Sequence, residues 1–321
     1  RFLIERGMNF RQPSAELFYP LHYACLNNSL DIVRYILEKD PLEIHECKQA
    51  PRCFICCAIS LDSTDVLQLL LEKGAEHCCK ENPLHRANVH HQTDTFKMIY
   101  EAGIRHPTDR YSLLMDSVIH RNESCVQYLL ENGEDPYYIA ENHQTALSHA
   151  CFDNQENIVK LLCNHMDVVD IDPNLKQKAA VHWICWSRNP EIVRTVLAKG
   201  IDVNRRDENG HSGPYYLCDS PNEDNIIDIL EQLLHAGFDV NGEGVPILYE
   251  FALAMSTQIK VIAWLLDHGA DPTAFIPGSN ETIYGIVIKR RKRDIVRLFE
   301  QYQNDPLKSV TNRFPRKFEL D

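Results

Sequence analysis

The chain has 321 residues, of which 44% are hydrophobic and 25% charged, a globular composition sufficient for a sizeable core or two ordinary domains. The formal charge of −13 disfavours binding to nucleic acid, and no apolar run approaches the roughly 18 residues that insert across a membrane. The twelve cysteines stand in a chain too long to need a disulfide framework and without a secretory leader, so we expect reduced thiols in an intracellular, cytoplasmic protein.

One phrase returns along the chain at a period of about 33 residues. It has apolar residues at i, i+3, i+4 and i+7 and ends at a glycine, which predicts a helix with one buried face and a left-handed residue after its end. The ends, in chain order, fall at Gly7, Asp40, Gly74, Gly103, Gly133, Met166, Gly200, Gly237 and Gly269. Asp40 and Met166 stand at positions that glycine occupies in the other copies.

A second, shorter apolar phrase lies roughly twenty residues upstream of each of these ends. It reads "YPLHYAC" at 19–25, "NPLHRA" at 82–87, "TALSHAC" at 145–151 and "AAVHWIC" at 179–185. Each unit is therefore predicted to be a helix, a short turn, a second helix and a connecting loop.

These units resemble the ankyrin repeat. The family signature T-P-L-H-x-A is matched best at Pro20–Ala24 and Pro83–Ala87, and its closing turn at Gly269–Pro272. The signature is degenerate at Ser112–Ser117 and Thr282–Val287. The resemblance implies an all-α solenoid of helix-turn-helix units with short β-hairpin-like finger loops.

The repeats predict one solenoid over residues 1–303 and a C-terminal tail over 304–321. Repeat boundaries are expected near residues 10, 43, 77, 106, 136, 170, 204, 241 and 273, about eight full repeats after a truncated first one. Because the chain opens on half a helix, we expect the natural protein to continue upstream of Arg1. We interpret the basic run Lys289–Arg293 as a solvated turn of a terminal cap, with an import or acidic-partner patch as the alternative. The tail is expected either to dock as an extended peptide or to be disordered.

The sequence contains no nucleophile elbow, phosphate-binding loop, H-E-x-x-H or dinucleotide motif, so we expect neither an enzyme nor a bound cofactor. The resemblance instead implies a partner protein on the concave face, bound by the variable position of each first helix and by the fingers. The first-helix set is Tyr23, Cys57, Arg86, Asp116, His149 and Trp183. The finger set is Tyr137, Tyr138, Arg205, Arg206 and His211.

Three histidines occupy the signature histidine position, namely His22, His85 and His182. The resemblance implies that each hydrogen-bonds main-chain atoms between adjacent repeats, so we interpret them as structural residues and not as ligands or bases.

The cysteine-rich stretch 53–58 aligns with residues 19–24 when counted back from Gly74. This register puts Cys53 at the helix-starting threonine position, Cys56 at the signature histidine position and Cys57 at the outward variable position. Zinc ligands must converge on one point, whereas Cys56 and Cys57 point about 100° apart on a helix. We therefore predict packing roles and no metal. The weak candidates for metal ligands are Cys47, Cys53, Cys56, Cys78 and Cys79.

The leading functional hypothesis is a non-enzymatic scaffold or adaptor, possibly a subunit of a larger assembly. The alternative is an ankyrin arm of a larger multidomain protein whose active part lies upstream. A minor alternative is a zinc-binding or redox-sensing module at the Cys47–Cys79 cluster.

Overall fold

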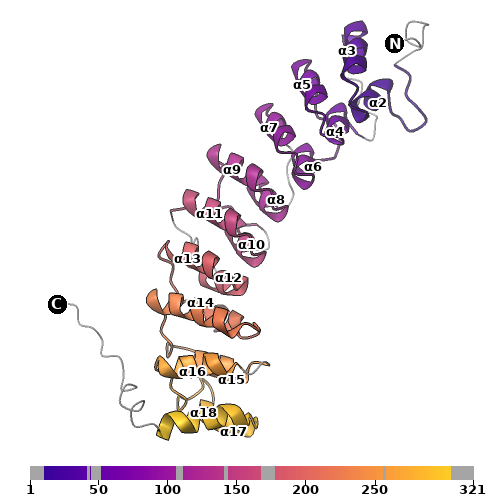
Figure 1. Cartoon of the computed structure of the whole chain (residues 1–321). Coiled ribbons are helices and arrows are strands. Elements are labelled where there is room, and N and C mark those ends of the chain that lie inside the picture. Colours follow the sequence, from indigo (N-terminus) through magenta and orange to yellow (C-terminus); the bar gives the residue numbers. More distant parts are fainter. Residues whose placement is uncertain are drawn as a thin grey trace, which may run out of the picture. The chain divides into compact units, whose positions relative to one another are not determined.

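The computed structural model describes residues 11–41, 44, 52–105, 111–140, 144–167, 178–255 and 258–304. The chain divides into two compact units, Arg1–Asn142 and His143–Asp321. Both units consist of helices joined by turns and loops (Figure 1), which confirms the all-α expectation.

The described helices alternate between a short first helix and a second helix that is in most pairs longer. In the first unit they are α2 (Pro20–Leu26), α3 (Leu30–Lys39), α4 (Phe54–Ile59), α5 (Thr64–Glu72), α6 (Pro83–Val89), α7 (Thr93–Glu101), α8 (Leu113–Ile119) and α9 (Glu123–Glu131). In the second unit they are α10 (Ala146–Phe152), α11 (Glu156–His165), α12 (Ala180–Ser187), α13 (Pro190–Leu197), the 3₁₀ helix η2 (Gly213–Leu217), α14 (Glu223–His235), α15 (Ile247–Leu253), α16 (Ile259–Asp267), α17 (Ile283–Lys289) and α18 (Arg293–Asn304).

Within each unit, the first helix of one repeat packs against the first helix of the next, and the second helices pack in the same way. In the first unit α2, α4, α6 and α8 pack in order, as do α3, α5, α7 and α9 (Figure 1). In the second unit the first helices α10, α12, η2, α15 and α17 pack in order, and so do the second helices. The second helices bury one face, as in α5, where Val66, Leu67 and Leu70 are fully buried. Each such side chain contributes about 1.5–3 kcal/mol by leaving water.

A single left-handed residue makes the turn between the two helices of a repeat. It has φ between 51° and 57° at Asn28, Asp62, His91, Arg121, Asn154, Arg188 and Arg291. The left-handed turn lets the next N–H reach back to the first helix, as Ser29 N–H does to the Ala24 carbonyl at 2.9 Å. Its residue type varies from copy to copy, and no pattern in the sequence predicted it.

Glycine ends most of the second helices, as the repeated phrase predicted. The residues Gly74, Gly103, Gly133, Gly200, Gly237 and Gly269 have φ between 71° and 92°, where a side chain is strained. The two copies without glycine end differently, since Asp40 and Met166 have extended backbones with φ of −145° and −113°.

One first helix departs from the others. Residues 213–217 form a 3₁₀ helix. Its first residue, Gly213, packs directly against α12, where a Cβ would lie 2.6 Å from a methyl carbon of Val181. Pro214 follows at the start of this helix. A turn then runs over residues 218–222 and leads into α14, which has 13 residues.

The fingers, the loops that connect one repeat to the next, carry little regular structure in the part of the chain that is described. There we find one isolated antiparallel bridge, between Phe275 and Thr282. Within the same residues no helix is long and apolar enough to cross a membrane.

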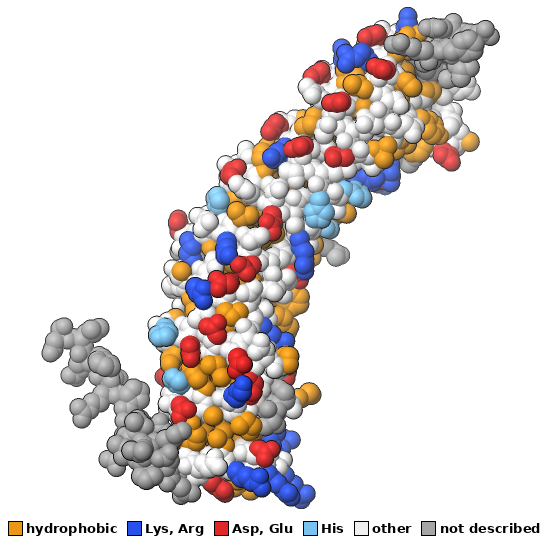
Figure 2. All heavy atoms as spheres, viewed as in Figure 1, with side chains coloured by type: hydrophobic (Ala, Val, Ile, Leu, Met, Phe, Trp, Pro, Cys, Tyr) orange, Lys and Arg blue, Asp and Glu red, His pale blue; other side chains and the backbone are white. Residues whose placement is uncertain are grey.

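The basic run Lys289–Arg293 comprises the last residue of α17, the turn at 290–292 and the first residue of α18, and Lys and Arg side chains gather there on the surface (Figure 2). Lys289 Nζ lies 2.5 Å from Glu281, and Lys292 Nζ donates to the Ala254 carbonyl at 2.7 Å. The run is thus a surface turn, as interpreted from the sequence. A further role in nuclear import stays a prediction, and the tail 305–321 lies outside the described residues.

Candidate functional site

The predicted partner-binding residues differ in how far they reach solvent. Tyr23 and Tyr138 are exposed. Seven are partly exposed, namely Arg86, Tyr137, His149, Trp183, Arg205, Arg206 and His211. Cys57 and Asp116 are buried, which corrects their assignment as partner-facing residues.

Cys57 is fully buried, as is every other residue of α4. Burial raises the pKa of its thiol to about 12, so the exposed, groove-facing thiol expected here is absent. Asp116 is 5% exposed, and its carboxylate is hydrogen-bonded to side chains of the neighbouring repeat. Its carboxylate accepts hydrogen bonds from Asn88 Nδ2 at 2.9 Å and His85 Nδ1 at 2.8 Å.

Two of the three signature histidines make the predicted inter-repeat bonds. Nδ1 of His22 accepts from the Tyr19 N–H, and Nε2 donates to the Arg52 carbonyl at 3.0 Å. His182 likewise accepts from the Ala179 N–H and donates to the carbonyl of His211. The third, His85, differs at its Nδ1: the ring is half-exposed and Nδ1 lies 2.8 Å from the Asp116 carboxylate, and among the described residues it makes no main-chain bond of the kind seen at His22.

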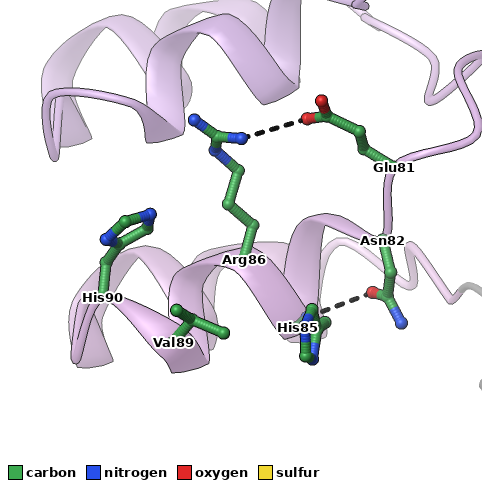
Figure 3. Close-up of a pocket in the computed structure, with 6 residues that line it drawn as sticks. All are labelled: Glu81, Asn82, His85, Arg86, Val89 and His90. Atoms are coloured by element: carbon green, nitrogen blue, oxygen red, sulfur yellow. Dashed lines mark hydrogen bonds and ion pairs between the residues drawn. The ribbon is translucent and has the colours of Figure 1, made fainter.

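The exposed side of α6 carries a pocket of about 290 Å³ (Figure 3). Its lining residues are Glu81, Asn82, His85, Arg86, Val89 and His90. Arg86 is tied down there, since its guanidinium donates to Glu81 at 3.2 Å and to Ser60 Oγ at 3.1 Å. Arg86, a predicted contact residue, therefore already links its own repeat to the preceding one.

A continuous run of aromatic side chains crosses three first helices of the second unit. We call it the aromatic ladder: Phe152 of α10, Trp183 and Trp186 of α12, and Tyr216 and Tyr215 of η2. Phe152 lies 5.5 Å from Trp186 between ring centroids, and Trp186 lies 5.2 Å from Tyr216. Offset or edge contacts at such distances stabilise aromatic pairs by about 0.5–1.5 kcal/mol.

Lys178, in the finger that precedes α12, makes cation–π contacts with the rings of the aromatic ladder. Its ammonium lies 4.2 Å from the Trp186 ring centroid and 4.4 Å from that of Tyr216. Its carbonyl accepts a hydrogen bond from the Trp183 indole N–H at 3.1 Å. Burial against the rings lowers the pKa of Lys178. The predicted residue Trp183 thus belongs to a larger surface whose other members the sequence analysis missed, although Trp186 lies one helical turn after Trp183.

The ladder remains partly open to solvent despite these contacts. Phe152 is 45% exposed and Trp186 is 38% exposed. At its end the predicted finger residue His211 stacks on Tyr215 with centroids 3.8 Å apart. His149, on the same helix as Phe152, faces Asp153 at 3.9 Å.

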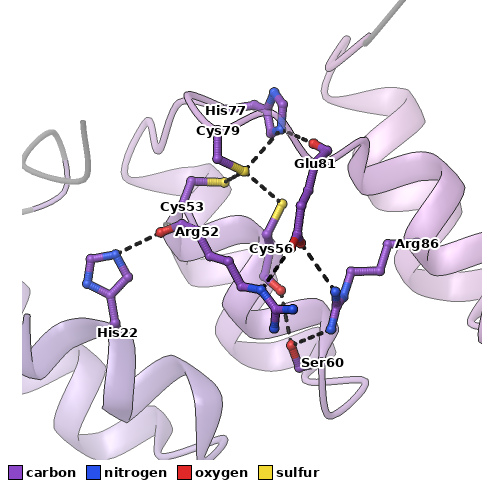
Figure 4. A network of polar contacts seen from close by, with 9 residues as sticks. All are labelled: His22, Arg52, Cys53, Cys56, Ser60, His77, Cys79, Glu81 and Arg86. Atoms are coloured by element: carbon purple, nitrogen blue, oxygen red, sulfur yellow. Dashed lines mark hydrogen bonds and ion pairs between the residues drawn. The ribbon is translucent and has the colours of Figure 1, made fainter. Parts of the chain in front are cut away.

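In the first unit, three cysteines and a histidine lie together at the start of α4 (Figure 4). They are Cys53, Cys56, His77 and Cys79, with their ligand atoms all within 4.8 Å of one another. Cys79 Sγ lies 3.6 Å from Cys53 Sγ, 3.4 Å from Cys56 Sγ and 3.7 Å from His77 Nε2. The hydrogen bonds between Cys79 and the thiols of Cys53 and Cys56 hold the pKa of Cys79 well below its usual range.

Of the other cysteines named as metal candidates, the described one, Cys78, is not part of this group. Cys78 is exposed, and Cys47 lies outside the described residues. His77 was missed by the sequence analysis, although its place two residues before Cys79 gives an H-x-C spacing. A second group of metal-type side chains, His85, Asp116 and His120, lies further along the same unit.

Glu81 ties the finger that carries His77 and Cys79 to the flanking helices. Its carboxylate accepts from Arg52 Nε at 2.8 Å and from Arg86 at 3.2 Å. Arg52 directly precedes Cys53 in sequence, so this ion-pair cluster fixes the finger next to the cysteines (Figure 4).

A family model described as "Ankyrin repeats (3 copies)" matches residues 21–110 and 114–207, more than half of the chain. The chain belongs to the ankyrin repeat family. Alpha-latroinsectotoxin-Lt1a of Latrodectus tredecimguttatus is 24% identical over 97% of this chain and 23% of its own length. The putative ankyrin repeat protein FPV023 of fowlpox virus (strain NVSL) is 36% identical over 26% of this chain and 19% of its own. The chain thus spans less than a quarter of either relative.

Solved ankyrin repeat domains share the fold. The domain of human ASB11 aligns with a TM-score of 0.55 at 19% identity, over 69% of this chain and 99% of that domain. The ankyrin repeat domain of Bcl-3 aligns with a TM-score of 0.55 at 20% identity, over 67% and 98%. Ankyrin repeats generally mediate protein–protein interaction, and no finding on this chain indicates catalysis.

Proposed function

We propose that this ankyrin repeat chain is a non-enzymatic scaffold or adaptor that binds a partner protein along its first helices and fingers. The aromatic ladder of the second unit is the observation that carries the proposal. It presents five large rings on one surface, and two of them, Phe152 and Trp186, are more than a third exposed. Tryptophan and tyrosine dominate binding energy at protein interfaces.

The aromatic ladder lies on a different face of the first helices from the side chains that pack one repeat against the next. The first helices already bury their inward side chains, such as Val181, Ile184 and Cys185 of α12, which are fully buried. Trp183 and Trp186 lie on the remaining face and touch rings of the neighbouring repeats. Rings fixed in this way lose little conformational entropy when a partner covers them.

The tyrosines among the other predicted contact residues extend the proposal to the first unit. Tyr23 and Tyr138 are exposed at a first helix and a finger, as a partner-facing surface requires. We include Tyr137, His149, Arg205, Arg206 and His211 as flanking contacts, with residues 1–303 acting as one ankyrin array.

The test compares two variants, a double and a single tryptophan substitution, in partner capture from a lysate of the native cells. We expect Trp186→Ala, combined with Trp183→Ala, to abolish recovery of proteins that the unchanged chain captures. The matched control is Trp264→Ala, which removes a half-buried ring from the second helix α16, where it stacks on His268 at 3.8 Å. Equal recovery by the ladder variant, with unchanged circular dichroism, would refute the ladder as the binding face.

The second candidate function is an ankyrin arm of a larger protein. It is favoured by the match to alpha-latroinsectotoxin-Lt1a, which covers 97% of this chain but 23% of the toxin. Sequencing the complete transcript tests it. An open reading frame confined to ankyrin repeats would rule out this alternative.

A further inference from the structure

We propose that Cys53, Cys56, His77 and Cys79 form a structural zinc site that joins the finger 77–81 to the first helix α4. Two of these residues are supplied by the helix start and two by the finger, so a bound ion links two successive repeats.

The distances match those of a tetrahedral zinc site. Zinc bonds of about 2.3 Å to sulfur and 2.0–2.1 Å to nitrogen give ligand-to-ligand edges of about 3.5–3.8 Å. Cys79 Sγ lies 3.6 Å from Cys53 Sγ, 3.4 Å from Cys56 Sγ and 3.7 Å from His77 Nε2. All four ligand atoms lie within 4.8 Å of one another. To close the tetrahedron, the His77 ring turns its Nε2 from the Glu81 carbonyl, 2.7 Å away, towards the three sulfur atoms.

The ankyrin fold itself aims these side chains at one point. At the signature histidine position, the ring of His22 reaches the residue just before the next first helix, Arg52, and His182 reaches His211 in the same way. Cys56 occupies this position in its own repeat. The same direction leads from Cys56 to the end of the finger 77–81, where Cys79 lies. A thiol thus replaces the imidazole that bonds adjacent repeats elsewhere.

The chemistry of the ligands favours zinc over the abundant hard cations. Thiolate and imidazole bind zinc, whereas magnesium and calcium take oxygen ligands. Four protein ligands leave no open position, which is the pattern of structural and not catalytic zinc. Binding displaces the thiol protons and takes the lone pair of a neutral His77 ring.

Nearby charges fit such a site. Zinc with three thiolates carries a net charge of about −1. Arg52 and Arg86, which share Glu81, add one net positive charge beside it. Because Cys53 and Cys56 are fully buried, this compensation lowers the cost of placing the ion between two repeats.

The first test is the metal content of the reduced chain, expressed with zinc and purified without chelators. We expect about one equivalent of zinc by mass spectrometry. Substitution of Cys56→Ser or Cys79→Ser is expected to remove most of it. Cys78→Ser is the matched control, because Cys78 is an exposed neighbour of Cys79 in the same finger, and it should keep the zinc.

Cobalt(II) provides a readout that does not depend on stability. Cobalt added to the metal-free chain should give thiolate charge-transfer bands and the visible bands of tetrahedral coordination. His77→Ala should keep the charge-transfer bands and change the visible ones. A chelator should lower the Tm of the unchanged chain and of Cys78→Ser, but leave Cys79→Ser unaffected.

Three results would overturn the proposal. The first is less than about half an equivalent of zinc in the reduced chain together with no tetrahedral cobalt spectrum. The second is equal zinc in Cys79→Ser and Cys78→Ser. The third is a disulfide between Cys56 and Cys79 in protein prepared without oxygen, since that bond consumes two of the ligands.

Discussion

The imidazole of His22 in α2 donates from Nε2 to the main-chain carbonyl of Arg52, thirty residues further on, at 3.0 Å. The bond joins one first helix to the start of the next, and the ring is fully buried. In the following repeat the same position is Cys56, whose thiol faces Cys79 at 3.4 Å. One position in the repeat therefore provides an inter-repeat hydrogen bond in one copy and a cluster of thiols in the next.

Replacement of this histidine should destabilise the first unit in a pH-dependent way. Burial lowers the pKa of His22 from 6.5 to about 4, so the folded chain holds it neutral. The unfolded chain takes up a proton below pH 6.5, so the stability due to this neutral ring is present above pH 6.5 and is lost as the pH falls towards 4. We expect His22→Ala to lower the free energy of unfolding by about 2–4 kcal/mol at pH 7.5.

Urea unfolding from pH 4.5 to 7.5 measures this effect. The difference between the unchanged chain and His22→Ala should shrink as the pH falls. His90→Ala is the control, because His90 is exposed at the end of α6. A loss for His22→Ala that does not vary with pH would contradict the argument.

Glu250 in α15 should give the opposite dependence on pH. It is 7% exposed and accepts a hydrogen bond from Ser212 Oγ at 3.1 Å. Burial raises the pKa of its carboxyl group to about 8 from 4.5, although the Ser212 bond and Arg206 oppose this. The folded chain therefore holds a proton that the unfolded chain releases above pH 4.5, and stability falls as the pH rises from about 4.5 to about 8.

The variant Glu250→Gln removes this titration while keeping the shape. We expect it to raise the free energy of unfolding at pH 9, by no more than about 5 kcal/mol, and to change it little at pH 5. Thermal melts across this range provide the measurement. Glu243→Gln, at an exposed finger position, should show no such trend, and a parallel shift in both variants would refute the prediction.

Asp116 should prove to be a structural residue. We expect Asp116→Ala to lower the free energy of unfolding by about 2–4 kcal/mol, because Asn88 and His85 lose a buried charged acceptor. Asp116→Asn should cost less, since its amide oxygen still accepts. Glu131→Ala, an exposed carboxylate that accepts from Gln127, is the control and should change stability by no more than about 0.5 kcal/mol. Chemical denaturation ranks the three, and an Asp116→Ala variant as stable as the control would restore a surface role.

The rings of the aromatic ladder should be energetically coupled. A double-mutant cycle of Phe152→Ala and Trp186→Ala in urea unfolding should give an interaction energy of about 0.5–1.5 kcal/mol, since their centroids lie 5.5 Å apart. The control cycle pairs Phe152→Ala with Trp264→Ala, on helices of different repeats, and should be additive within about 0.5 kcal/mol. Equal coupling in both cycles would mean that the ladder rings do not form one surface.

The sequence predicted the helices of the repeats well, but it predicted little of the surface that they form together. The spacing of apolar residues and glycines predicted the helices and their ends, because a helix requires one buried stripe and a left-handed residue after it. Gly74 and Gly237, for example, adopt the left-handed conformation expected after the second helices. The aromatic ladder was predicted only at Trp183, since its members come from three repeats and meet only when those repeats stack.

By itself the sequence determined the repeat, its period and the ankyrin family, since each depends on local helix periodicity and on turn chemistry repeated along the chain. Only the tertiary structure decided which side chains share a surface or a cluster. Cys57 was expected to face outward but is buried, and Cys53 and Cys56 meet His77 and Cys79 more than twenty residues away. The physical reason is that the packing between repeats, and the fold of the finger that connects them, set these contacts, and neither can be read from the helical period of one repeat.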